Sequence, residues 1–199
     1  MQQATASSAR GAEREREILD VALALIGEVG YERMSMDSLA ARAHASKATL
    51  YRRWPGKAEL VVEALRSRSC TIPGGNANTG SLRGDLLAWL RDQRDILTGK
   101  DGPLLVGLIM AARGDPELAS LLREQFGEDK AAAAGALLGR AIARQEIPPN
   151  ASPGVFTEIA PAMLLMRVIL SDQPTDDAFL AHIVDDVLLP TLRASTAEA

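Results

Sequence analysis

Apolar residues recur every three or four positions in the first part of the chain. Between residues 8 and 29 they fall at Ile18, Val21, Ala22, Leu25, Ile26 and Val29. This i, i+3, i+4, i+7 spacing predicts an amphipathic helix with one buried face. Gly30 follows directly, at the position where a helix commonly ends.

The next residues predict three short helices. Ser35 and Ser46 are good N-caps for helices over residues 36–43 and about 47–54, which a three-residue turn separates. Pro55-Gly56 ends the second of these, and a fourth helix starts after that break. In the third helix, Leu50 and Trp54 are expected to face the core.

The rest of the chain again shows helical spacing. Residues 71–81, rich in Gly, Asn and Thr, predict a linker between a domain over 1–70 and a second over 82–199. Asp115 and Ser152 are predicted caps of later helices, because a proline follows each of them. No alternating strand pattern occurs, so the sequence predicts an all-α protein of about nine helices.

Composition narrows the functional classes. Aromatic residues make up only 4% of the chain, and alanine-rich runs favour helix. The single cysteine, Cys70, excludes an internal disulfide. The chain has only two histidines, His44 and His182, and they are far from Cys70 in the sequence, so we expect no metal site and no cofactor. The sequence shows no nucleophile–base pair of the kind that an enzyme needs, so we expect that the protein is not an enzyme. Without a signal peptide or membrane span, we expect a soluble cytoplasmic protein with no membrane partner.

Charge is unevenly distributed along the chain. The net charge is −4, yet residues 1–70 carry 11 Lys and Arg against 9 Asp and Glu. Residues 35–57 hold five cations and only one acid, Asp37. Such a local basic cluster on an acidic protein suggests one contact with a polyanion, although a solvated helix face is the alternative.

The helix, turn and helix over residues 35–54 have the layout of a helix-turn-helix, whose second helix enters the DNA major groove. Residues 47–49 and Arg52 are expected to reach base edges, with Arg52 suited to guanine. Tyr51, Arg53 and Lys57 are expected to hold phosphates. The candidate DNA-binding residues are Ser35, Ser46, Lys47, Ala48, Thr49, Tyr51, Arg52, Arg53 and Lys57.

Residues 30–65, "GYERMSMDSLAARAHASKATLYRRWPGKAELVVEAL", strongly resemble the DNA-binding region of TetR (tetracycline-repressor-like) transcriptional regulators. The shared positions are Gly30-Tyr31, Ser35, Leu39-Ala40, Ala43, Ser46, Thr49-Leu50-Tyr51, Trp54, Lys57 and Leu60. Two positions depart from the family pattern. His44-Ala45 replaces the usual Gly-Val, so His44 is expected in a left-handed conformation at some strain. Met34 replaces the commoner Thr.

The resemblance implies a dimeric regulator, most often a repressor, which a small-molecule effector releases from a palindromic operator. A DNA-binding or interaction module without such a ligand is the alternative. Homodimerisation is expected through the last two helices, about 153–170 and 176–193. Candidate interface residues, some of which must face the core instead, are Ala160, Ala162, Met163, Met166, Leu180, Ile183, Val184, Val187 and Leu188.

An apolar effector is expected in the second domain. Methionines and single aromatic side chains adapt well to apolar ligands, and ordinary core packing is the alternative for each of them. The candidate pocket residues are Trp89, Leu105, Ile109, Met110, Phe126, Leu137, Met163 and Met166.

Overall fold

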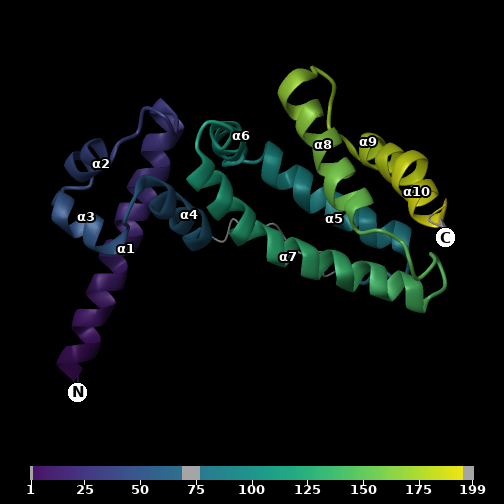
Figure 1. Cartoon of the computed structure of the whole chain (residues 1–199), viewed down its shortest axis with the longest axis horizontal. Coiled ribbons are helices and arrows are strands. Elements are labelled where there is room, and N and C mark those ends of the chain that lie inside the picture. Colours follow the sequence, from purple (N-terminus) through teal and green to yellow (C-terminus); the bar gives the residue numbers. More distant parts are fainter. Residues whose placement is uncertain (1, 69–76, 195–199) are drawn as a thin grey trace. The chain divides into compact units, whose positions relative to one another are not determined.

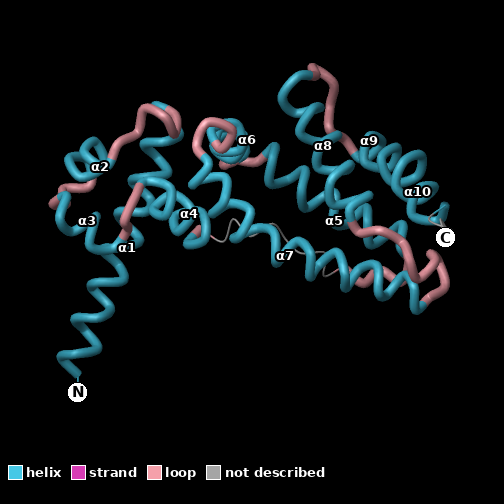
Figure 2. The backbone as a smooth tube through the Cα atoms, viewed as in Figure 1, coloured by secondary structure: helices cyan, strands magenta, loops and turns pink. Residues whose placement is uncertain are grey.

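A computed structural model describes residues 2–68 and 77–194, and all regular structure in these ranges is helical (Figure 2). The elements are α1 Gln2–Val29, α2 Met36–Arg42, α3 Lys47–Arg53, α4 Lys57–Ser67, α5 Leu82–Thr98, α6 Gly102–Ala111, α7 Pro116–Ala143, α8 Gly154–Leu170, α9 Asp177–His182, the π-helical turn η1 Ile183–Leu188, and α10 Leu189–Ala194. Because α9, η1 and α10 form one continuous run, the prediction of an all-α protein with about nine helices is confirmed.

The described residues fall into two compact units. The first combines residues 2–68 with 103–125, and the second combines 77–102 with 126–194. The single linker predicted at 71–81 does not account for residues 103–125, which group with the N-terminal helices. Cys70 and much of the expected linker lie outside the described residues.

In the first unit, α1 contacts α4, and α2 contacts both α1 and α3 (Figure 1). The α1 face predicted from the apolar spacing is buried, with Ile18 only 3% exposed. Leu50 is fully buried and Trp54 is 5% exposed, which confirms that both belong to the core. Gly30, at φ 82°, ends α1 as expected.

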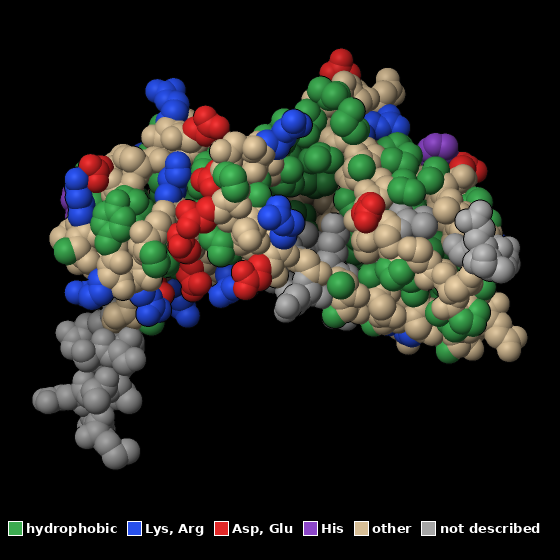
Figure 3. Space-filling model, viewed as in Figure 1, with side chains coloured by type: hydrophobic (Ala, Val, Ile, Leu, Met, Phe, Trp, Pro, Cys, Tyr) green, Lys and Arg blue, Asp and Glu red, His purple; other side chains and the backbone are tan. Residues whose placement is uncertain are grey.

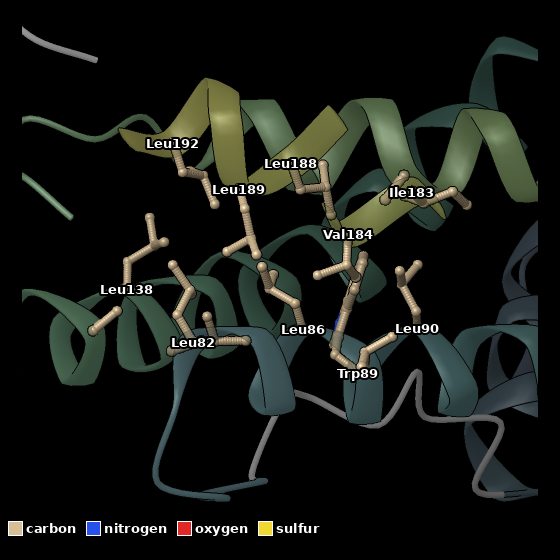
Figure 4. Packing of buried hydrophobic residues seen from close by; sticks show 14 of the residues in the cluster. Leu82, Leu86, Trp89, Leu90, Leu138, Ile183, Val184, Leu188, Leu189 and Leu192 are labelled. Atoms are coloured by element: carbon tan, nitrogen blue, oxygen red, sulfur yellow. The ribbon is translucent and has the colours of Figure 1, made fainter. Parts of the chain in front are cut away.

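In the second unit, α5 packs against the C-terminal helical run. Figure 4 shows side chains of α5 pointing toward side chains of η1 and α10. The Leu189 N–H bonds to the Val184 carbonyl five residues earlier, which is π-helical spacing. Pro190 follows at once, and it lacks an N–H and clashes with the preceding turn, which accounts for the departure from α-helical spacing.

Most predicted helix caps are confirmed. The N–H of Ser38 donates to Ser35 Oγ and the N–H of Thr49 donates to Ser46 Oγ, each at 3.1 Å. The Leu118 N–H donates to Asp115 Oδ1 at 3.0 Å. The prediction for Ser152 was wrong, because α8 begins at Gly154 and has no side-chain cap hydrogen bond.

Candidate nucleic-acid interface

The buried residue of α3, Leu50, determines which side of this helix faces outward. Because a helix turns about 100° per residue, Ala48 and Arg52, each two positions from Leu50, project almost opposite the core. Both are exposed, and so is Tyr51 at 50%. Lys47 and Thr49 flank them. The predicted base-contacting residues therefore centre on the exposed side of α3.

The turn between α2 and α3 has a strained backbone, and a side chain of α1 holds it in place. His44 has φ 48°, so the expected left-handed conformation is confirmed. The Arg14 guanidinium on α1 donates to the carbonyl of Ala43 and, at 3.2 Å, to that of His44. Arg14 thus fixes the turn, and with it the start of α3, to α1.

Several cations of the basic cluster are paired with carboxylates. Arg42 makes a two-pronged ion pair with Glu28 on α1, at 2.5 Å for both hydrogen bonds. The hydrogen bond from Arg42 lowers the pKa of the exposed Glu28 carboxyl. Lys47 pairs with Asp37 at 2.7 Å.

Arg53 is also paired, whereas Arg52 is not. The Arg53 Nε and Nη2 donate to Glu15 Oε1 at 3.0 and 2.6 Å. Within the described part of the chain, Arg52 has no ion pair or hydrogen bond. Figure 3 accordingly shows acidic and basic side chains next to one another on the surface of the first unit. The cluster is less positive than a count over residues 35–57 suggests.

Lys57 at the start of α4 lies over Tyr31. Its Nζ is 4.0 Å from the ring centroid and donates to the Tyr31 carbonyl at 3.1 Å. The Tyr31 hydroxyl donates to Asp115 Oδ2 at 2.6 Å. Burial and this hydrogen bond raise the pKa of Tyr31, while the same bond lowers the pKa of Asp115. Lys57 is therefore half-buried and oriented before any phosphate arrives.

A groove of about 470 Å³ separates α3 from the N-terminal half of α1. It is lined by Gly11, Arg14, Glu15, Ile18, Thr49, Arg52, Arg53 and Trp54. Sequence reasoning missed Arg14 and Glu15. Their positions four and three residues before the buried Ile18 would have placed them on the side of α1 that faces its neighbours.

The residues predicted to line the effector pocket are divided between the two units. Trp89 and Leu137 are buried in the core of the second unit and Met163 packs against it, whereas Met166 is 56% exposed. The remaining described members, Leu105, Ile109 and Met110, belong to the first unit. The side chain of Phe126 lies outside the described part.

A second hollow, of about 400 Å³, lies at the C-terminal end of α7. It is lined by Ile142, Gln145, Glu146, Ile147, Pro148, Pro149 and Arg193, and it contains no predicted pocket residue. Among the described residues, no three metal-ligating side chains cluster in a way that could hold an ion. No helix described in either unit combines the length and apolar character needed to cross a bilayer.

The nine predicted dimerisation residues divide by exposure into three groups, of which Met163 and Val187 form the intermediate one. Those buried in the core of the second unit are Ala160, Leu180, Ile183, Val184 and Leu188. Ala162 and Met166 are exposed instead. They share one stripe of α8 with Ile159, Ile169 and Leu170, the last of which is 72% exposed.

Two family models match this chain. Residues 18–64 match "Bacterial regulatory proteins, tetR family", and residues 76–187 match "Tetracyclin repressor-like, C-terminal domain". The first covers the C-terminal part of α1 together with α2, α3 and most of α4, and the second covers most of the second unit.

Individual relatives agree with both models. A DNA-binding transcriptional repressor TetR of Mycobacteroides abscessus is 39% identical, over 93% of this chain and 97% of the relative. The crystal structure of the TetR family transcription regulator SCO0332 is 29% identical, covers 90% of this chain and 98% of its own, and has a TM-score of 0.67. The structure of AibR in complex with isovaleryl coenzyme A and operator DNA shares the fold, at 21% identity and a TM-score of 0.57, over 90% of this chain and 98% of its own.

Proposed function

Because this chain belongs to the TetR family of DNA-binding transcriptional regulators, we propose that it is a repressor that a small-molecule effector releases from a palindromic operator. The 39% identical relative is named a transcriptional repressor, which supports this direction of control. We infer that it works in the cytoplasm, where the chromosome lies, and that it has no catalytic role.

The observation that carries the proposal is the exposed face of α3. Arg52 projects opposite the buried Leu50 and has no partner in the described residues, so its guanidinium is available for a guanine edge. The small side chain of Ala48 lets the helix approach the base edges closely. Arg14 and the Ser46 cap hold α3 in place, which limits the ordering cost of binding.

Neighbouring residues supply contacts that fix the position of the protein on DNA. Ser35 and Tyr51 have exposed hydroxyl groups suited to phosphate oxygens. Lys57 retains further N–H donors besides the one that bonds the Tyr31 carbonyl. Such contacts set the register of α3 without selecting a sequence.

A helix-turn-helix dimer binds two half-sites at a fixed spacing, so the operator symmetry follows that of the protein. We place the dimer contact on the exposed apolar stripe of α8. A single copy leaves Met166 and Leu170 largely in water, and burying them against a second copy is favourable.

The effector is expected to be apolar and to bind in the region of residues 82–199. AibR, a protein of the same fold, has been crystallised with isovaleryl coenzyme A and operator DNA, which illustrates a small molecule and DNA held by one such protein. A thermal-shift screen of apolar compounds and acyl thioesters tests this part. A true effector raises Tm, and above its Kd the shift grows with the logarithm of its concentration.

Footprinting with the purified full chain on DNA upstream of its own gene tests DNA binding. We expect protection of a palindrome with a Kd of about 10 nM, which is typical of specific complexes. The affinity should fall steeply as salt increases. Absence of salt-sensitive, sequence-specific protection there and on a random-sequence library would refute the proposed function.

A further inference from the structure

The ion pairs around α3 reveal a pattern that the DNA-binding function alone does not require. Lys47 and Arg53, which flank the outward face of α3, are each bound to a carboxylate, while Arg52 at its centre has no partner in the described residues. We propose that Glu15 and Asp37 are specificity-determining residues, which weaken binding to DNA without an operator by occupying these flanking cations. The inference rests on the proposed DNA-binding function.

Glu15 is well placed for this role. It lies on α1, one turn before the buried Ile18, so its backbone is anchored to the core of the first unit. Its side chain is 24% exposed and accepts both hydrogen bonds from Arg53 on one oxygen, Oε1. Arg53 itself remains 61% exposed, so a phosphate can approach it only beside a fixed negative charge.

Asp37 acts on the other side of the face. It lies in the first turn of α2 and reaches Lys47 in the first turn of α3 at 2.7 Å. Both side chains are more than half exposed, at 63% and 60%. This pair is therefore open to competition from a DNA phosphate, whereas the Glu15 pair is more firmly held.

The physical reason lies in the source of non-specific affinity. Binding to arbitrary DNA comes almost entirely from cations that meet phosphates and release counterions into solution. A cation already paired with a carboxylate must first lose that partner, and the carboxylate then remains close to the phosphate and repels it. Base contacts by Arg52 offset this cost at an operator but not elsewhere, so the two acids widen the gap between specific and non-specific affinity.

Glu15→Gln in the full chain tests the inference, because glutamine has nearly the same size and lacks the charge. The probes are an operator duplex selected from a random library by the wild type, and a shuffled duplex of equal length. We expect tighter binding of Glu15→Gln to the shuffled duplex and a smaller change at the operator. One added phosphate contact steepens the salt slope by about 0.9, so from 50 to 200 mM salt its affinity should fall about threefold more than that of the wild type.

Glu13→Gln is the matched control. Glu13 is exposed on the same helix, has no ion pair or hydrogen bond in the described residues, and its removal changes the net charge equally. Equal effects of Glu13→Gln and Glu15→Gln would overturn the proposal, since only overall charge would then matter. A larger loss of affinity at the operator than at the shuffled duplex would also overturn it, because Glu15 would then position Arg53 for operator binding.

A double-mutant cycle identifies the partner. In an Arg53→Gln background, Glu15→Gln should no longer tighten binding to the shuffled duplex; an undiminished effect would contradict the role given to the pair. Asp37→Asn should act like Glu15→Gln, and its effect should disappear in Lys47→Gln. If the wild type selects no sequence from the library, the proposed function fails. If it selects one but the variants keep its specificity ratio, only this inference fails.

Discussion

The hydroxyl of Tyr31 donates a 2.6 Å hydrogen bond to the carboxylate of Asp115, which in turn caps the start of α7. Tyr31 lies directly after the glycine that ends α1, and the ammonium group of Lys57 lies over its ring. One side chain thus connects the loop before the helix-turn-helix, the start of α4 and the start of α7. This connection is one of the contacts that hold residues 103–125 to the N-terminal helices, and the hydrogen bond from Arg66 to Gln125 is another.

Tyr31→Phe should destabilise the protein while leaving the ring and the Lys57 contact in place. Removing a hydrogen bond to a charged group costs about 1.5–3 kcal/mol. Urea denaturation followed by circular dichroism measures the change. Tyr51→Phe is the control, because that side chain is 50% exposed and should change the unfolding free energy by less than about 0.5 kcal/mol. Equal effects of the two substitutions would contradict the role assigned to the Tyr31–Asp115 bond.

Local features of this site could be predicted from the sequence, and long-range ones could not. The caps at Ser35 and Ser46 depend on neighbours within a few residues, so the local pattern identified them, whereas the left-handed His44 was expected because the TetR family usually has glycine there. Glu15 lies 38 residues from Arg53, and Tyr31 lies 84 residues from Asp115. Such pairs depend on how the helices pack, which one sequence does not reveal.

The residues of the effector pocket were likewise difficult to predict from the sequence alone. Trp89 and Leu137 were predicted as pocket residues, and both are buried. A buried apolar side chain in a helix lines a cavity or fills the core, and its spacing is identical in both cases. Only the volume left between helices distinguishes them, so these residues could not be assigned to a ligand from sequence.

Acid should destabilise the second unit through Asp85. Its carboxylate is fully buried, and although burial raises its pKa, hydrogen bonds from Thr79 and Arg144 outweigh this and lower it overall. A folded pKa below the unfolded value of about 4 means that the contribution is complete above pH 4 to 5 and is lost as the pH falls through the folded pKa.

Asp85→Asn should therefore lower the free energy of unfolding at pH 7 by about 2 kcal/mol and flatten its dependence on pH between about 5 and 3. Urea titrations at several pH values measure both. Asp95→Asn serves as the control, since Asp95 is paired at the surface. An unchanged pH slope in Asp85→Asn would exclude Asp85 as the source of the acid sensitivity.

The turn at His44 should tolerate glycine but not a β-branched residue. With φ 48°, His44→Val adds strain of about 1–2 kcal/mol, whereas glycine adopts this conformation freely. Denaturation midpoints should therefore fall for His44→Val and stay within about 0.5 kcal/mol of the wild type for His44→Gly. Equal loss in both variants would indicate that the imidazole itself, rather than the backbone, is required.

Arg52→Ala should reduce operator affinity and relax its sequence preference. A two-pronged guanine contact is worth about 1–3 kcal/mol, so the Kd at the operator should rise about tenfold while binding to a shuffled duplex changes much less. Arg16→Ala removes an exposed arginine of α1 that has no described ion pair, and should leave the operator Kd within about twofold. Fluorescence anisotropy on both duplexes measures the change. A uniform loss across sequences would assign Arg52 to phosphate contact instead.

Leu170→Glu should separate the dimer into folded monomers. Leu170 is 72% exposed in one copy, so a charge there costs little in the monomer, but it would be buried and unpaired in a contact between two α8 stripes. Sedimentation velocity measures the mass, and circular dichroism checks the fold. Met110→Glu is the matched control, because Met110 is also exposed and apolar, at 53%, but lies on α6 in the first unit. A dimer that survives Leu170→Glu yet dissociates with Met110→Glu would move the interface from α8 to α6.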